Sequence, residues 1–409
     1  MSSKKTMTSR ERILAAIKHQ EPDILPIDFG GMRSTGINTL AYVQLKKYLG
    51  ITAGNVRVYD LFQQLAEPED SVLRRMGGDV IQLHRLAPSF GIPIDQWKDW
   101  TLADGSPCLV PECFNPVRLA DGGLGIYHGD TLIAIMPAGN YYFNLVHHPY
   151  AGCETGQDID RIPIAEISGQ ELDFLAGNAR KMFENTDYAI LGAFGGNILE
   201  AGQAAFGYEK FMLLIAAEPG LVRHFFERIT EAYLRGLEKY LAAVGKYIQI
   251  IQMGDDLGAQ NGPQISPAMY REMIKPYHRA QFQYLREHTR ASVFFHCCGA
   301  IYDLIPDLIE AGVQILNPVQ ISARGMDPAR LKREFGKDLV FWGGGADMQQ
   351  TVPNKTLDQI RDETKKLIEI FAPGGGYVFN QVHNIQADVP PEKVMAIYDT
   401  AQTFRRNRF

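Results

Sequence analysis

The chain has 409 residues, of which 45% are apolar and 22% are charged, the composition of an ordinary globular protein with a large core. A formal net charge of −6 without a basic run argues against nucleic acid or an acidic membrane surface as the main partner. Five cysteines at scattered positions give no disulfide framework and favour a reducing, cytoplasmic location.

The N-terminal stretch from Met1 to Gln20 is charged and lacks the apolar region of a signal peptide. No part of the chain approaches the roughly 18 uninterrupted apolar residues of a membrane span. Thr8 or Ser9 is expected to cap a first helix over Arg10–Lys18.

Apolar segments with strand character then alternate with helical patterns. Strands are expected at residues 24–29, 79–83, 188–194, 247–253, 292–296, 313–316, 339–342 and 377–382. Helices are expected at residues 218–244, 267–288, 302–311 and 357–372. This alternation predicts the α/β class, and its eight units predict a (β/α)8 TIM barrel. An open doubly wound sheet is the alternative, but no G-x-G-x-x-G follows the first strand.

Residues 97–144 break the alternation, because they are rich in glycine, proline and aromatic residues. Asp121-Gly122 and Gly129-Asp130 are turn signals between short segments of alternating polarity. We expect a β-meander inserted after the second strand and overhanging the barrel mouth, with a surface hairpin of no function as the alternative. Since no long linker occurs, residues 1–409 are expected to form one domain that carries this insertion.

The segment from Ser292 to Gly299 predicts a buried strand that ends in residues of the types that bind metals. Side chains alternate along a strand, so His296 and Cys298 should share one face and Cys297 the other. An imidazole and a thiolate on one face form most of a zinc site with an open position. His383, near the end of another apolar segment, is the third candidate ligand. The alternative for each is a packed core residue at a strand end.

Polar residues at the other strand ends are candidates too, because barrel chemistry takes place at the C-terminal ends of the strands. Asp255, Asp256 and Glu200 are candidate catalytic groups, and any of them could also support the metal. Alternatively, one of the aspartates caps the helix that follows. Glu200 could likewise be an ordinary glutamate in the first turn of a helix, stabilised by the helix dipole. His278, within the helix expected at 267–288, is expected on the surface. Candidate substrate-binding residues are Arg33, His84, Asn197, Asn317, Gln320 and Trp342.

Several of these segments also resemble the uroporphyrinogen decarboxylase superfamily. The resemblance is carried by Gly254-Asp-Asp-Leu-Gly258, His296-Cys-Cys-Gly299, Asn317-Pro-Val-Gln320 and Gly374-Gly-Gly-Tyr-Val-Phe379. It spans nearly the whole chain from Arg10 onward and implies a (β/α)8 barrel. The superfamily contains decarboxylases of the haem pathway and zinc-dependent cobamide methyltransferases.

The chain departs from the decarboxylases in two places. They hold the carboxylates of the porphyrinogen with an arginine-rich segment, whereas residues 28–36 here contain one arginine, Arg33. They also have an aspartate shortly after the second strand, where this chain has His84-Arg85-Leu86. Both departures favour the methyltransferase branch.

The methyltransferases use a His-x-Cys pair and a distant cysteine on the last strand. His296 and Cys298 match the pair, and His383 stands in place of the distant cysteine. The resemblance therefore implies bound Zn²⁺ and the branch found in anaerobes beside corrinoid proteins, including methyltransferases of O-demethylase systems.

The ligand set bears on the substrate. One thiolate and two neutral imidazoles leave zinc with a formal positive charge, which favours a hard oxygen such as that of a methyl ether. No Asp-x-His-x-x-Gly cobalamin-binding segment occurs, so the corrinoid is expected on a partner protein. One alternative is methyl transfer in the reverse direction, from the corrinoid protein to an acceptor. The others are uroporphyrinogen decarboxylation and a non-catalytic barrel that binds a tetrapyrrole or corrinoid.

Overall fold

The computed structural model describes residues 6–406. Residues 1–5, the beginning of the N-terminal stretch Met1–Gln20, lie outside the described residues. Among the described residues, no helix is both long and apolar enough to cross a membrane. The first helix, α1 (Ser9–Ile17), begins where the sequence predicts, because Thr8 and Glu11 form a reciprocal capping box.

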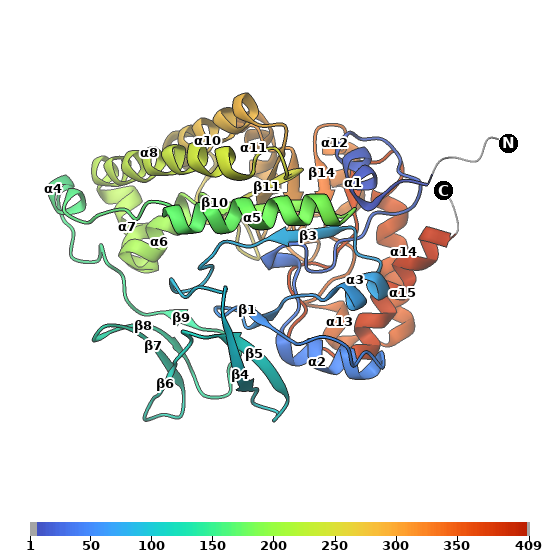
Figure 1. The fold of residues 1–409 in the computed structure, drawn as a ribbon. Coiled ribbons are helices and arrows are strands. Elements are labelled where there is room, and N and C mark those ends of the chain that lie inside the picture. Colours follow the sequence, from blue (N-terminus) through green and yellow to red (C-terminus); the bar gives the residue numbers. More distant parts are fainter. Residues whose placement is uncertain (1–5, 407–409) are drawn as a thin grey trace.

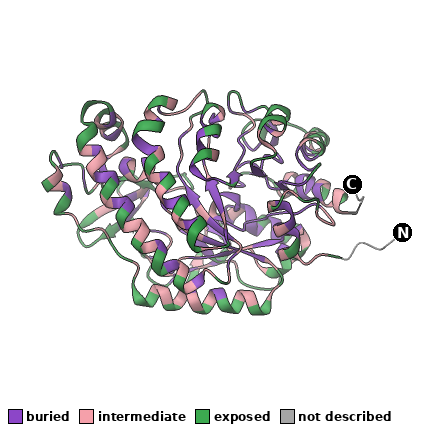
Figure 2. Cartoon of the chain, turned by 90° about the horizontal axis from the view of Figure 1, so that it is seen from above, coloured by how far each residue is buried: buried purple, intermediate pink, exposed green. Residues whose placement is uncertain are grey.

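Within residues 6–406, a curled parallel sheet of seven strands forms the centre of the molecule, and Figure 2 shows these strands buried inside a ring of helices. Their spatial order is β15 (Tyr377–Val378), β14 (Val340–Trp342), β13 (Ile315–Asn317), β12 (Ser292–His296), β11 (Ile250–Gly254), β10 (Ala189–Gly195) and β3 (Val80–Leu83). Every neighbouring pair is parallel. The predicted TIM-barrel class is confirmed.

The first predicted strand, at residues 24–29, lies between β15 and β3 without forming a regular strand. Phe379 N–H donates to Pro26 O, and Asp79 N–H donates to Ile27 O. Pro26 has no amide hydrogen, and the Ile27 amide donates to the Asp79 side chain at 3.0 Å. The ladder is therefore reduced to an isolated bridge between Ile27 and Phe379 on the β15 side. The Asp79–Ile27 hydrogen bond links the segment to the β3 edge.

Amphipathic helices cover the outside of the sheet (Figure 1). For example, α8 (Pro219–Val244) buries Val222, Phe225, Phe226 and Ile229 at the three- and four-residue spacing of a helix face. The helix predicted at 267–288 is divided into α9 (Pro267–Met269), the π-helical turn η2 (Tyr270–Ile274) and α10 (Lys275–His288).

The remaining helical elements connect or cover these layers. They are η1 (Arg33–Thr35), α2 (Thr39–Tyr48), α3 (Asp70–Met76), α4 (Gly156–Asp160), α5 (Gly169–Asn185), α6 (Leu199–Phe206), α7 (Tyr208–Ala217), η3 (Tyr302–Leu304), α11 (Ile305–Ala311), α12 (Pro328–Phe335), α13 (Thr351–Asn354), α14 (Leu357–Phe371) and α15 (Pro391–Arg406).

The barrel interior is closed at the N-terminal ends of the strands. Val80 and Ile250, which begin β3 and β11, belong to one buried cluster with Ile13 and Ala16 of α1. Because α1 covers this end, polar chemistry is left to the opposite edge, where the strands end.

Residues 97–144 form two small antiparallel sheets, in agreement with the predicted β-meander. One pairs β4 (Trp97–Thr101) with β5 (Pro107–Pro111), and the other joins β6 (Val117–Arg118), β7 (Leu124–His128), β8 (Thr131–Met136) and β9 (Asn144–Leu145). Figure 1 shows this unit extending away from the helices that surround the barrel. The hairpin of β1 (Val58–Asp60) and β2 (Leu65–Ala66) adjoins it, and Val58 shares an apolar cluster with Val110 and Phe143.

Candidate metal centre

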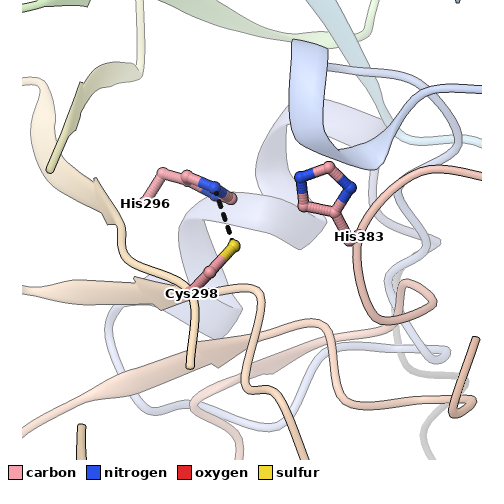
Figure 3. A group of neighbouring side chains, drawn as sticks. All are labelled: His296, Cys298 and His383. Atoms are coloured by element: carbon pink, nitrogen blue, oxygen red, sulfur yellow. Dashed lines mark hydrogen bonds between the residues drawn. The ribbon is translucent and has the colours of Figure 1, made fainter. Parts of the chain in front are cut away.

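His296, Cys298 and His383 converge at the C-terminal edge of the barrel (Figure 3). One ligand atom from each side chain lies within 4.8 Å of the other two. The His296 Nε2 and Cys298 Sγ atoms are 3.3 Å apart. Donors around tetrahedral zinc are about 3.3–3.6 Å apart, given the usual Zn–N and Zn–S bond lengths. The His296 and Cys298 donors are thus already close to zinc spacing, and His383 completes the group within 4.8 Å.

Strand alternation separates Cys298 from its neighbour Cys297. The Cys297 side chain is buried in the main core and accepts a hydrogen bond from Leu257 N–H at 3.4 Å. Burial raises the pKa of the Cys297 thiol well above its ordinary value, so this cysteine stays protonated. It is a core residue beside the centre.

His383 reaches the centre from the segment that follows β15. Its backbone φ of +62° lies in the left-handed region, which is strained for a residue with a β-carbon. The segment is held by buried hydrogen bonds: Gly36 N–H donates to Asn384 Oδ1 at 3.0 Å, and Ile385 N–H donates to Gly36 O at 3.0 Å. Burial, with a smaller contribution from His296, lowers the pKa of His383 to about 4. The imidazole is therefore neutral, the form that binds metals.

The donor set fits zinc chemically. Burial and the nearby Asp256 carboxylate raise the pKa of the Cys298 thiol well above its ordinary value. A thiolate at this position consequently needs a cation beside it, and a metal ion deprotonates a thiol that it binds. One sulfur and two imidazole nitrogens belong to the ligand types that zinc prefers. His296, Cys298 and His383 would hold the ion.

Asp256 borders these three side chains. Its Oδ1 atom accepts a hydrogen bond from Cys298 N–H at 2.7 Å and lies 3.7 Å from His296 Nε2. The Glu200 carboxyl group in turn accepts from Asp256 N–H at 2.9 Å and from the Asn197 side-chain amide. Burial, and then the carboxylates of Asp256 and Asp255, raise the pKa of Glu200 to about 8. Glu200 is thus protonated near neutral pH.

Asp255 has a different environment from Asp256. It is fully buried and accepts from the backbone N–H groups of Leu199 and Glu200, at 2.8 and 2.9 Å. Both amides lie in the first turn of α6, so Asp255 caps that helix from another strand. This contact places Glu200, the second residue of α6, next to Asp256.

The expectation that His278 lies on the surface is wrong. This residue is 1% exposed, and its Nε2 atom lies 3.1 Å from Asp255 Oδ2. Its Nδ1 atom lies 3.2 Å from the Tyr270 hydroxyl, across the π-helical turn η2. The helical spacing of the buried residues Ile274, His278 and Leu285 is the sequence signal that could have placed it inside.

Arg33 lies at the same edge of the barrel. It pairs with Asp60, and its guanidinium lies 5.7 Å from the centre of the Phe62 ring. The next residue, Ser34, places its hydroxyl oxygen 3.3 Å from His296 Nε2. Ser34 is not among the predicted site residues, because only tertiary contact brings it to a histidine 262 positions away.

The other predicted substrate-binding residues do not all lie at the candidate metal centre. Asn317 Oδ1 lies 2.7 Å from His296 Nδ1, and Gln320 Oε1 accepts from Gly299 N–H at 2.7 Å. Trp342 is fully buried, and its indole N–H donates to Asp28 at 2.8 Å. His84 packs on the Tyr59 ring and lines a separate cavity of 290 Å³. The structure thus brings the side chains of Asn317 and Gln320, but not those of His84 or Trp342, to the segment that carries His296 and Cys298.

The fold and the convergent side chains define a (β/α)8-barrel protein with a candidate metal centre. The family model of uroporphyrinogen decarboxylase (URO-D) matches residues 151–404, and the chain belongs to this family.

Curated relatives include two bacterial uroporphyrinogen decarboxylases. The protein of Xanthomonas euvesicatoria pv. vesicatoria is 26% identical over 212 residues, which cover 49% of this chain and 54% of that protein. The protein of Thioalkalivibrio sulfidiphilus is 24% identical over 189 residues, which cover 44% of this chain and 48% of that protein. The chain thus spans about half the length of these relatives.

Among solved structures, the chain is similar to a methyltransferase from Methanosarcina mazei. The TM-score is 0.60 with 17% sequence identity, and the match covers 97% of this chain and 99% of the other. At this identity the likeness concerns the fold.

Proposed function

We propose that this protein is a zinc-dependent methyltransferase that moves a methyl group from a small O-methyl ether to the cobalt of a corrinoid on a separate protein. The observation that carries the proposal is the convergence of His296, Cys298 and His383 at the C-terminal edge of the barrel. The name of the similar Methanosarcina mazei structure agrees with this reaction class.

An ether methyl is a poor electrophile, because its leaving group is an alkoxide or phenolate. Zinc would supply a Lewis acid for that oxygen as its negative charge develops. The chain provides two imidazoles and a thiol, and Asp256 fixes the backbone amide of Cys298. Glu200 holds a proton on its carboxyl group next to Asp256, and we propose it as the general acid for the leaving oxygen.

The insertion contacts the segment that follows His383 through the loop between β8 and β9. The Tyr142 hydroxyl donates to Gln386, three residues after His383, and Phe143 N–H donates to Phe62 O at 3.0 Å. We propose that this wall shapes the donor site, that Arg33 contributes to it, and that the adjoining mouth receives the corrinoid protein. In this proposal the barrel and its insertion, residues 1–409, work as one domain.

Decarboxylation is the second candidate, favoured by the names of the curated relatives. A porphyrinogen substrate carries many carboxylates and needs several cations to bind them. Arg33 is the single arginine of residues 28–36, and it is already paired with Asp60. This pairing makes the methyltransferase proposal the stronger of the two.

Metal content separates the candidates. We expect about one zinc per chain by elemental analysis of protein purified without chelator, and loss of most of it in His383→Ala and Cys298→Ser. His224→Ala is the matched control, since His224 pairs with Asp160 on the surface. A zinc-loaded protein should then demethylate methyl ethers with cob(I)alamin as acceptor. A wild-type protein that takes up no zinc when zinc is supplied would reject the proposal in favour of decarboxylation.

A further inference from the structure

The two ring nitrogens of His296 have different surroundings. Nε2 faces Cys298 Sγ and the Ser34 hydroxyl, each at 3.3 Å. Nδ1 lies 2.7 Å from Asn317 Oδ1. His296 and Asn317 are register partners on the parallel strands β12 and β13, so their side chains share one face of the sheet. The strand pairing itself therefore sets the imidazole beside the amide.

The Asn317 amide has one orientation that satisfies its neighbours. Its Nδ2 group lies 2.9 Å from the Trp342 carbonyl oxygen, which can only accept a hydrogen bond. The Oδ1 atom consequently faces His296, and an amide oxygen can only accept as well. The proton of the neutral His296 ring must then be on Nδ1, which leaves the lone pair on Nε2.

This arrangement depends on fixed backbone groups. Asn317 is fully buried, so bulk water does not compete for its amide. Trp342 is held in β14 by its pairing with Val378 of β15, and Gly343 N–H donates to Val378 O at 3.1 Å. The backbone of three neighbouring strands thus determines the position of one proton.

We propose that Asn317 is a positioning residue that fixes His296 in the Nδ1–H tautomer and so presents the unprotonated Nε2 atom to the metal. The inference rests on the metal site of the proposed function, but not on methyl transfer. It gives Asn317 a role different from the substrate contact expected from the sequence. In the other tautomer the Nε2 proton would face Cys298 and Asp256, and it would have to leave before a metal could bind.

The test compares Asn317→Leu with wild type in two measurements. The first is the Kd for zinc, from competition with a chromophoric chelator. The second is the His296 tautomer, from long-range ¹H–¹⁵N NMR of protein labelled at histidine, before and after zinc is added, with His296→Gln to assign the signal. Gln249→Leu is the control, because the Gln249 amide bonds to Ile190 N–H at the opposite end of the barrel.

We expect Asn317→Leu to weaken zinc binding about 10- to 100-fold, the usual effect of removing the partner of a ligand histidine. The metal-free variant should lose the pure Nδ1–H pattern, whereas Gln249→Leu should keep both the wild-type Kd and the wild-type tautomer. Asn317→Asp, which keeps the acceptor, should keep the Nδ1–H tautomer.

A folded Asn317→Leu variant with the wild-type Kd and tautomer would overturn the proposal. If that variant does not fold, Asn317→Ala removes the same acceptor, and the same readouts decide. A wild-type protein that binds no zinc, combined with a tautomer change in the variant, would reject the proposed function while supporting control of the His296 proton by Asn317.

Discussion

Glu200 illustrates at the residue scale how the barrel edge sets the protonation state of a side chain. Its carboxyl group is near two aspartates, yet its hydrogen-bond donors are Asp256 N–H and the Asn197 amide rather than a cation. Burial and the two neighbouring charges both oppose ionisation. Ionisation of Glu200 should therefore lower the free energy of unfolding by a measurable amount.

The raised pKa of Glu200 gives a prediction for stability. Between its ordinary pKa of 4.5 and its folded value of about 8, the folded state holds a proton that the unfolded state releases. Stability must then fall as pH rises through this window, by up to about 1.4 kcal/mol per pH unit. Glu200→Gln, which resembles the protonated form, should remove this part of the slope. Urea unfolding of metal-free protein at pH 5, 6, 7 and 8 measures it.

Glu209→Gln is the matched control for that series, because Glu209 lies in the first turn of the neighbouring helix α7. It should leave the pH dependence of unfolding as in wild type. Equal slopes for wild type and Glu200→Gln would show that Glu200 is already ionised at neutral pH, and would remove it as a general acid.

At the scale of elements, Asp255 links α10 to the first turn of α6, where Glu200 lies. The π-helical turn η2 precedes α10, and Tyr270 within it reaches the ring of His278. His278 in turn contacts Asp255, which caps α6. A local change of helix type is thus connected to the position of a candidate catalytic group.

His278→Leu should destabilise the protein by about 1–3 kcal/mol, because Asp255 loses a buried hydrogen-bond partner. We expect His288→Leu, at the exposed end of the same helix, to change the unfolding free energy by no more than about 0.5 kcal/mol. Urea unfolding at pH 7 gives both values. Similar values for the two variants would mean that His278 does not support Asp255.

Sequence patterns predicted most of the elements because apolar periodicity reflects local geometry. Alternation along the strand correctly separated Cys297 from the face shared by His296 and Cys298. The first predicted strand is reduced to an isolated bridge, because Pro26 and the Asp79 side chain interrupt its ladder. His278 was misplaced although the helical spacing of Ile274, His278 and Leu285 indicates a buried position. Its contact with Asp255 joins distant positions, and no local pattern records that partner.

At the scale of the whole molecule, the inserted sheets give the barrel edge a second wall. They carry an apolar cluster of their own, which includes Val110 and Phe143. Their connection to the segment that follows His383 is polar, since the Tyr142 hydroxyl donates to Gln386. The insertion and the barrel therefore meet at Gln386, three residues after His383.

Tyr142→Phe tests whether this connection steadies the segment around His383. The variant loses one hydrogen bond, worth about 1 kcal/mol, which corresponds to roughly fivefold in a local opening equilibrium. We expect faster amide hydrogen exchange at residues 383–386, measured by mass spectrometry, with unchanged exchange in α8. Tyr127→Phe is the control, because Tyr127 is an exposed residue of β7 within the same insertion. Unchanged exchange at residues 383–386 in Tyr142→Phe would show that the buried bonds from Gly36 hold the segment without help from the insertion.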